Sequence, residues 1–211
     1  MGYTSITLSW SKVKNASGYY VYKKTGSGYK KIGSTKNLVY KVKKVELNTN
    51  YTFKVTPYVS NNGSATTGTG ATVKIKSAKS AYLMDIAPPY KCSQNFRYND
   101  YSQTKFVMGG TSYTHGFLYD LTYAYDESVY INLKGKYKTL SFISGVTDNS
   151  YGDGTIYLYS DGDLIASYKQ KSNELPKSHS FNVSECIQLT IRVEHSGDSC
   201  EYGFANIKIS K

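Results

Sequence analysis

The stretch GTIYLYSDGDLIASYK, residues 154–169, contains the clearest secondary-structure signal in the chain. Apolar and polar residues alternate on both sides of Asp161-Gly162-Asp163, and an Asp-Gly pair between two such runs indicates a tight turn. The stretch therefore predicts a β-hairpin. A second hairpin is predicted where HSGDSC joins QLTIRVE at 188–194 to FANIKIS at 204–210.

Short runs with the composition of strands surround these two hairpins. They lie at 104–108, 128–133, 138–146 and 178–183. With the four hairpin strands they make about eight short strands separated by long loops, which predicts a jelly-roll β-sandwich for residues 79–211.

The first part of the chain shows the same two-residue period. In residues 5–14 the apolar side chains Ile6, Leu8 and Trp10 alternate with polar ones, and residues 19–24 and 51–59 repeat the pattern. Turn signals such as TGSG and SNNGS separate these runs, and no helical periodicity is present. The pattern predicts a second antiparallel sandwich. The expected fold class is therefore all-β, with two antiparallel β-sandwiches.

Composition agrees with a β-rich globular protein. The 211 residues include 23 Tyr and 18 Gly, which favour strands and turns, and 39% are hydrophobic, which is enough for a packed core. No run approaches 18 consecutive apolar residues, so we expect no membrane insertion.

Charge is distributed unevenly along the chain. The net charge is +11, but residues 1–78 carry 13 Lys and a single acid, Glu46, whereas residues 79–211 have a net charge of −1. This asymmetry supports a domain boundary near residue 78, which gives domains 1–78 and 79–211. The lysines of the first domain either form an anion-binding patch or fill the solvent face of its strands. The second explanation fits better because no aromatic-basic groove or nucleic-acid motif accompanies them, so we expect no nucleic-acid partner.

The three cysteines, Cys92, Cys186 and Cys200, leave at least one free thiol within the chain. Neither they nor the three His have zinc-ligand spacing. A disulfide between Cys92 and Cys200 requires that the first and last segments of the second domain lie side by side. Residues 1–10 lack the features of a secretory signal, as would any segment cut from a larger exported protein.

Signatures of catalysis are weak. The sequence has no nucleophile-elbow phrase, no Cys/His signature and no phosphate loop at Gly109-Gly110, and the acids of 120–163 are not paired by any recognisable spacing. We therefore predict that this chain is not an enzyme.

The first domain resembles a fibronectin type III domain of the bacterial extracellular kind. The matching residues are Trp10 in LSW, GYYVY at 18–22 and VELNTNYTFKV at 45–55, where Val45 and Tyr51 have the spacing of a tyrosine corner. The sequence begins at what would be the second strand of that fold. The resemblance implies a spacer or packing partner.

The second domain resembles the NPCBM domain, a novel putative carbohydrate-binding module related to carbohydrate-binding module family 51. The matching phrases, in order, are YLMDI at 82–86, MGGTSYTHGF at 108–117, VYINLKGKYKTLSF at 129–142, SGV at 144–146, IYLYSDGDLI at 156–165, QLTIRVE at 188–194 and YGFANIKI at 202–209. The resemblance implies a jelly roll that binds sugars with loops at one end. Galactose-binding members place a His after the glycine of the Y-x-x-G phrase, whereas His115 precedes Gly116. Sugar binding as a class is therefore implied, and galactose specificity is not.

Sugar rings stack on aromatic side chains, and their hydroxyls need polar partners. Residues 113–127, which we expect to be largely loop, and the loop 147–153 are rich in both kinds of residue. The candidate ligand-binding residues are Arg97, Tyr113, His115, Tyr119, Tyr123, Tyr125, Asp148 and Tyr151. The alternative for each Tyr is an ordinary sheet or core position, and for His115 a bond to the backbone. Asp148, Asn149 and Asp153 either bind Ca²⁺ or cap a turn, because they have the oxygen chemistry but lack the DxDxDG order.

The leading hypothesis is a non-catalytic carbohydrate-binding module with a fibronectin-like spacer. Its partners would be a glycan and an attached catalytic domain, within a larger secreted or cell-surface bacterial protein. No cofactor is expected apart from the Ca²⁺ alternative. The competing hypothesis is a structural or protein-binding stalk. Exposure of Tyr119, Tyr123 and Tyr125 favours sugar binding, and their burial favours the stalk.

Overall fold

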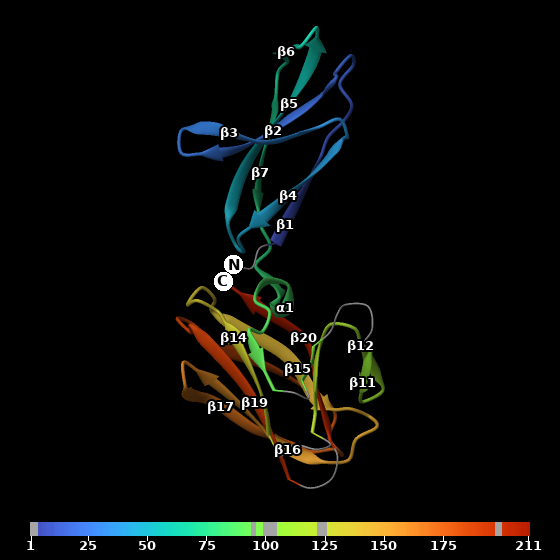
Figure 1. Ribbon diagram of the computed structural model, residues 1–211, viewed down its shortest axis with the longest axis vertical. Helices are drawn as coiled ribbons and strands as arrows, with labels where there is room; N and C mark the ends of the chain where they lie inside the picture. The colour runs from blue at the N-terminus through green and yellow to red at the C-terminus, as the bar shows by residue number, and fades with distance from the viewer. Residues whose placement is uncertain (1–3, 94–95, 99–104, 122–125, 197–199) are drawn as a thin grey trace. The chain divides into compact units, whose positions relative to one another are not determined.

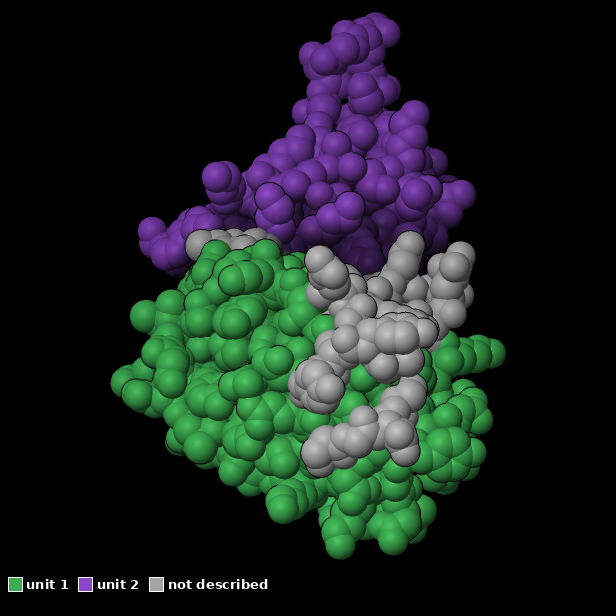
Figure 2. All heavy atoms as spheres, turned by 60° about the horizontal axis from the view of Figure 1, so that its bottom comes forward, with its two compact units in different colours: residues 1, 80–211 green, residues 2–79 purple. Residues whose placement is uncertain are grey.

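The computed structural model describes residues 4–93, 96–98, 105–121, 126–196 and 200–211 (Figure 1). Antiparallel strands make up nearly all of the regular structure in these residues, which confirms the all-β fold class. The chain divides into two compact units between Lys79 and Ser80, drawn in purple and green in Figure 2. We call residues 2–79 the N-terminal unit and residues 80–211 the C-terminal unit. None of the described helical segments has the length and hydrophobicity that a membrane-crossing helix requires.

The N-terminal unit consists of two antiparallel sheets. Its strands are β1 (Thr4–Ser9), β2 (Gly18–Thr25), β3 (Gly28–Thr35), β4 (Val39–Val45), β5 (Asn50–Asn61), β6 (Ser64–Thr67) and β7 (Ala71–Lys76). β1 and β4 form one sheet. The other sheet has the order β3-β2-β5-β6, with β7 also paired to β5. The five-stranded sheet is therefore wider than the sheet that covers it.

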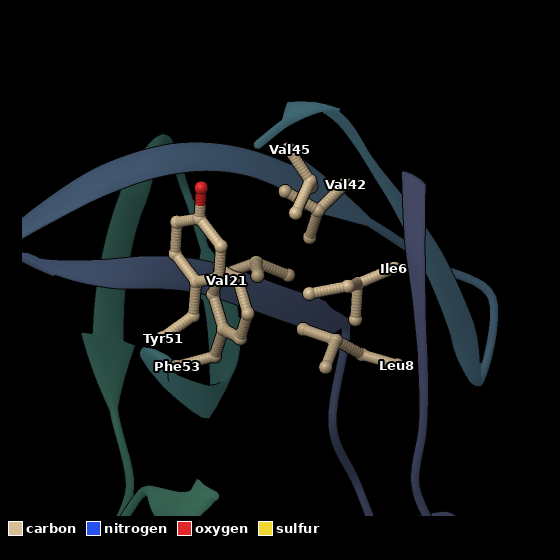
Figure 3. Close-up of a cluster of buried hydrophobic side chains, with 7 residues drawn as sticks. All are labelled: Ile6, Leu8, Val21, Val42, Val45, Tyr51 and Phe53. Atoms are coloured by element: carbon tan, nitrogen blue, oxygen red, sulfur yellow. The ribbon is translucent and has the colours of Figure 1, made fainter. Parts of the chain in front are cut away.

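The core of the N-terminal unit lies between these two sheets (Figure 3). Val21 and Phe53 of the larger sheet are fully buried, and they face the inward side chains Ile6 and Leu8 of β1. The alternation in the sequence places these residues on one face of each strand. The hydroxyl oxygen of Tyr51 accepts a hydrogen bond from the backbone N–H of Glu46 at 3.0 Å, and this bond closes the connection between β4 and β5.

The alternating pattern of 5–14 extends beyond the strand that forms. β1 ends at Ser9, and residues 14–15 form a turn in which Asn15 has a φ of 63°. Asn tolerates this left-handed conformation better than most residues do. The period-2 signal therefore predicted the strand correctly but not where it ends.

The C-terminal unit is a larger sandwich. Its elements are β8 (Ser80–Tyr82), α1 (Leu83–Ile86), β9 (Lys91–Cys92), β10 (Phe96–Tyr98), β11 (Phe106–Met108), β12 (Thr111–Tyr113), β13 (Gly116–Asp120), β14 (Asp126–Asn132), β15 (Thr139–Val146), β16 (Asp153–Ser160), β17 (Asp163–Gln170), β18 (Lys177–Asn182), β19 (Gln188–Ser196) and β20 (Glu201–Ser210). One sheet has the order β10-β13-β20-β15-β18, with β8 also paired to β20. The facing sheet has the order β17-β16-β19-β14-β9, and β11 and β12 form a separate hairpin.

Aromatic residues fill the space between these two sheets. Phe117 and Phe204, on neighbouring strands, stack with ring centroids 4.9 Å apart, and both are fully buried. The β11–β12 hairpin packs over β20 at Gly203, where an added Cβ would lie 2.6 Å from the Met108 sulfur and 2.8 Å from the Phe106 ring. Glycine at this position therefore allows the hairpin to approach the sheet closely.

The hairpin predicted at 154–169 is confirmed, because β16 and β17 pair along their length. Asp161 and Gly162 at its turn have φ angles of 53° and 99°, the conformation that a two-residue hairpin loop requires. The Asp161 carboxylate accepts hydrogen bonds from the backbone N–H groups of Ile187 and Gln188, and these bonds lower the pKa of that carboxyl.

The second predicted hairpin is wrong. β19 and β20 do not pair with each other, because β19 lies between β16 and β14 in one sheet and β20 lies between β13 and β15 in the other. The HSGDSC segment therefore connects the two sheets. A turn-rich sequence allows the chain either to reverse or to cross, and pairing with more distant strands decides between the two.

The expectation that 113–127 is largely loop is also wrong for its centre. β13 occupies Gly116–Asp120, and its residues Phe117, Leu118 and Tyr119 are all buried. Both faces of this strand are covered, since Leu118 belongs to a cluster with Phe106 and Met108 of the β11–β12 hairpin. The strand therefore lacks the alternation that marks a half-exposed strand.

All three cysteines are free, and Cys92 is exposed.

Candidate functional site

Three loops of the C-terminal unit meet at one end of its sandwich. They are the turn Gly109–Gly110 between β11 and β12, the segment 147–153, which joins β15 to β16 and includes the first residue of β16, and the connection 171–176 between β17 and β18. The last two cross from one sheet to the other. We call these three segments the loop cluster.

Asp148 joins two of the three loops. Its carboxylate accepts hydrogen bonds from the backbone N–H groups of Gly109 at 2.6 Å and Gly110 at 2.9 Å. Its own N–H donates to the carbonyl oxygen of Val107 at 3.0 Å. Gly109 and Gly110 have φ angles of 56° and 73°, and this backbone conformation turns both N–H groups toward one acceptor.

Tyr151 is the most exposed large hydrophobic side chain in this region, with 82% of its surface accessible. Both neighbours of Tyr151 are held in place. The Ser150 hydroxyl oxygen accepts the backbone N–H of Glu201 at 2.9 Å, and the Gly152 carbonyl accepts the Cys200 thiol at 3.0 Å and the Tyr202 hydroxyl at 3.3 Å. The exposed ring therefore stands on an anchored turn.

The groups beneath this turn are buried and neutral. Burial raises the pKa of the Cys200 thiol to about 11, and it also raises the pKa of the Tyr202 phenol. The Tyr202 ring packs directly against the backbone of Gly154, where a Cβ would lie 2.3 Å from the Tyr202 hydroxyl oxygen. Both groups consequently act as hydrogen-bond donors at neutral pH.

The third loop is attached through Asp153 and Pro176. The Asp153 carboxylate accepts the backbone N–H of Ser172 at 2.9 Å. Pro176 packs against Gly145 and Gly109, where an added Cβ would approach its ring within 3.1 Å and 2.7 Å. Leu175, beside this contact, is 74% exposed. The cluster thus presents an aromatic ring, an aliphatic side chain and several carboxylates on an anchored backbone, which is the chemistry that a sugar requires.

Two of the residues predicted from the sequence, Asp148 and Tyr151, belong to the loop cluster. Tyr113 lies at the base of the β11–β12 hairpin, half-buried, with its ring 5.8 Å from that of Phe106. His115 stacks on Tyr82 at 4.4 Å. The carbonyl of His115 pairs with Asn206, five residues along β20 from the loop anchor Glu201, or about 17 Å in an extended strand. The structure therefore does not bring His115 to the cluster.

The prediction that Tyr119 contacts a ligand is wrong. Its side chain is fully buried, and its hydroxyl donates to the Ile191 carbonyl of the facing sheet at 2.7 Å. Burial, with a smaller contribution from Glu127, raises the pKa of this phenol well above its usual range. Tyr119 therefore holds the two sheets together and does not contact a ligand.

The remaining candidates are described only in part. Tyr123 and Tyr125 lie outside the described residues. Leu121, just before them, donates its N–H to the Cys200 carbonyl at 2.8 Å, at the same end as the loop cluster. Arg97 is placed by its backbone in the edge strand β10, opposite Leu118 of β13.

The calcium alternative has no support from the geometry. Within the described residues, no group of three or more His, Cys, Asp or Glu side chains lies close enough to hold a metal ion. Asp148 and Asp153 instead accept backbone hydrogen bonds from other loops. These bonds correspond to the turn-capping alternative.

Sequence reasoning missed the contribution of 171–176. This segment has the Ser, Asn and Pro residues of a loop, KSNELP, but nothing in them indicates which other loop it contacts. The anchors Ser150 and Gly152 were also missed, because their partners lie about 50 residues away in β20.

No family model matches the chain, and no curated protein matches it. Among solved structures, the chain is similar to CBM51-2 in complex with GlcNAc and INT domains from Clostridium perfringens ZmpB, with a TM-score of 0.51 and 14% identity. This match covers 78% of the chain but 38% of that structure. The CBM51 of C. perfringens GH95 in complex with methyl-galactose matches with a TM-score of 0.50 and 15% identity, over 62% of this chain and 99% of that one.

A third structure contains the M60 catalytic domain with CBM51-1 and CBM51-2 of C. perfringens ZmpB. It matches with a TM-score of 0.51 and 13% identity, over 98% of this chain and 30% of that one. At such low identity the likeness shows the fold alone. The chain therefore contains the β-sandwich fold of carbohydrate-binding modules.

Proposed function

We propose that the C-terminal unit binds a neutral glycan at the loop cluster and catalyses no reaction on it. The observation that carries this proposal is Tyr151, which is 82% exposed between two anchored neighbours. An exposed aromatic ring on a fixed turn loses little conformational freedom when a sugar ring stacks on it. Asp148 lies three residues before Tyr151 in the same connection, and each of its carboxylate oxygens retains a second lone pair for a sugar hydroxyl.

The comparisons support the same class of function. Two of the similar structures contain modules in complex with GlcNAc or methyl-galactose, and a third contains modules beside a catalytic domain. By analogy, we place this chain in a larger secreted or cell-surface bacterial protein that includes a catalytic domain. The N-terminal unit, which we propose to be fibronectin type III-like, then acts as a spacer. The near-neutral charge of residues 79–211 suits an uncharged ligand.

A glycan array probed with the whole chain tests the proposal, followed by calorimetry on each hit. Tyr151→Ala should weaken binding about tenfold, the size expected when a stacked aromatic ring is lost. Tyr90→Ala is the matched control, because Tyr90 is 57% exposed and contacts Tyr130 and Gln188 away from the loop cluster. Absence of binding to any glycan at millimolar concentration would refute the function. If both variants lose the same amount of glycan affinity, the binding site is not at the loop cluster.

Burial of Tyr119 favours a second candidate, a structural or protein-binding stalk. In that case the loop cluster would be a rigid end of the sandwich with no sugar ligand. The array distinguishes the two functions, since a stalk predicts no hit and no effect of Tyr151→Ala.

A further inference from the structure

The N-terminal unit has an open groove along one of its sheet edges. Within the described residues, β4 pairs only with β1, so its other edge has no strand partner. A cavity of about 460 Å³ follows this edge, lined by the consecutive residues Tyr40 to Val45 of β4. Lys23, Ile32 and Tyr51, from the facing sheet, form its other wall. The groove exists because a two-stranded sheet covers a five-stranded one.

The groove has an apolar floor and a cationic rim. Ile32 is partly buried and contributes aliphatic surface, and Val42 and Val45 line the groove although most of each side chain is buried in the core. The rim carries four lysines, Lys23, Lys41, Lys43 and Lys44. The Lys23 amine lies 4.4 Å from the centre of the Tyr51 ring, and that ring is fixed by the bond between its hydroxyl oxygen and the Glu46 N–H. This cation–π contact orients one of the four charges.

An irregularity in β4 adds to the cationic rim. The pairing with β1 shifts between Thr4–Val45 and Ile6–Val42, and Lys44 in the bulge has a φ of 60°. Such a conformation is uncommon for a residue other than Gly, Asn or Asp. As a result, Lys43 and Lys44 are both exposed, although a regular strand would turn one of them inward. The backbone is thus distorted at the point where it places two adjacent amines on the surface.

The charge of this unit limits what the groove can bind. Glu46 is the only acidic residue among residues 1–78, against 13 lysines. Lysines on an edge strand normally prevent pairing with other strands, but this protection acts through repulsion and desolvation. A strand that carries carboxylates would be attracted instead, and a second copy of this basic unit would be repelled.

We propose that the groove along β4 binds an extended acidic segment of a partner protein, which pairs with β4 as an added strand. Its alternate apolar side chains would enter the groove over Ile32 and Val42, and its carboxylates would meet the four lysines of the rim. Main-chain pairing supplies affinity in this mode of recognition, and the alternating side chains supply specificity. This site is separate from the loop cluster and does not depend on glycan binding.

The test is an NMR titration of the whole ¹⁵N-labelled chain with a nine-residue peptide of alternating Glu and Val. Amide signals of Tyr40 to Val45 should shift on binding. Two matched peptides should not bind: one with Lys in place of Glu, and one with N-methyl groups on alternate residues, which block strand pairing. If the N-methylated peptide or inorganic polyphosphate binds as tightly as the Glu-Val peptide, the groove is a general polyanion surface and the proposal fails.

A triple variant of the chain, Lys41→Gln with Lys43→Gln and Lys44→Asn, should bind the peptide about tenfold more weakly, as expected for three exposed ion pairs. Asn is chosen at position 44 because it tolerates a positive φ. The control variant, Lys12→Gln with Lys14→Gln and Lys36→Gln, removes the same charge from residues that do not line the groove and should change affinity by less than about threefold. Equal losses in the two variants would overturn the assignment to this groove.

Discussion

The two units are both antiparallel sandwiches, but they differ in how their sheets are completed. In the N-terminal unit a two-stranded sheet covers a five-stranded one, which leaves the edge of β4 open beside a groove with four lysines. In the C-terminal unit a six-stranded sheet faces a five-stranded one, and three loops are tied together at one end by backbone and side-chain hydrogen bonds.

The comparison shows that charge and candidate glycan site are separate features of this chain. Four of the lysines line a groove at an open sheet edge, whereas the exposed Tyr151 stands on neutral, buried supports. The net charge of +11 therefore describes the N-terminal unit and not the glycan site that we propose. The experiments below test whether the two units are as distinct as this comparison requires.

The largest expected effect comes from removing one core aromatic ring in each unit. Phe53 and Phe204 are both fully buried, so Phe53→Ala and Phe204→Ala should each lower the free energy of unfolding by about 3–5 kcal/mol. Each loss should appear only in the NMR signals of the unit that contains the substitution, measured along a urea titration. If Phe53→Ala destabilises both units equally, they unfold as one cooperative body and the comparison breaks down.

A smaller effect is expected at alkaline pH in the C-terminal unit. Burial raises the pKa values of Tyr119 and Tyr202, so the folded state keeps phenol protons that the unfolded state releases above about pH 10. The stability that depends on these two phenols is therefore fully present below that pH and falls as the pH rises, by about 1.4 kcal/mol at pH 11 for each phenol.

The variant Tyr119→Phe isolates the contribution of one buried phenol to this alkaline loss. At pH 7 it should cost about 1 kcal/mol, because the Ile191 carbonyl loses its hydrogen bond. Its loss of stability between pH 7 and pH 11 should be about 1.4 kcal/mol smaller than that of the wild type, because Tyr202 and Cys200 still contribute. Urea unfolding at pH 7 and pH 11 measures both quantities. An unchanged pH dependence would show that Tyr119 does not contribute to the alkaline loss.

The features that the sequence predicted well are those that local residues determine. The Asp161-Gly162 turn fixes its hairpin, and the alternation of Ile6 and Leu8 fixes the inward face of β1. The second hairpin was predicted wrongly because the choice between reversal and crossing depends on strands β14 and β15, far away in the sequence.

The candidate site illustrates the same limit. Tyr119 and Tyr151 are the same residue type in loop-like sequence contexts, yet one is fully buried and the other is 82% exposed. The buried position of Tyr119 depends on its hydrogen bond to the Ile191 carbonyl, 72 residues away. A single sequence does not indicate this pairing. Asp148 was predicted as a polar site residue, but its role in holding Gly109 and Gly110 depends on tertiary contacts.

The smallest expected effect tests whether the loop cluster is held together by Asp148. Ionised acceptors form hydrogen bonds roughly twice as strong as neutral ones, so Asp148→Asn should weaken the bonds to the Gly109 and Gly110 N–H groups. We expect hydrogen exchange at these two amides to accelerate about tenfold, while global stability changes by less than about 0.5 kcal/mol, as is usual for an exposed side chain.

Asp163→Asn, which changes an exposed acid beside another turn, serves as the control and should leave hydrogen exchange at Gly109 and Gly110 unchanged. Unaltered exchange in Asp148→Asn would mean that the glycines are protected by the packing of Pro176 on Gly109, and that the loops of the C-terminal unit do not depend on this carboxylate.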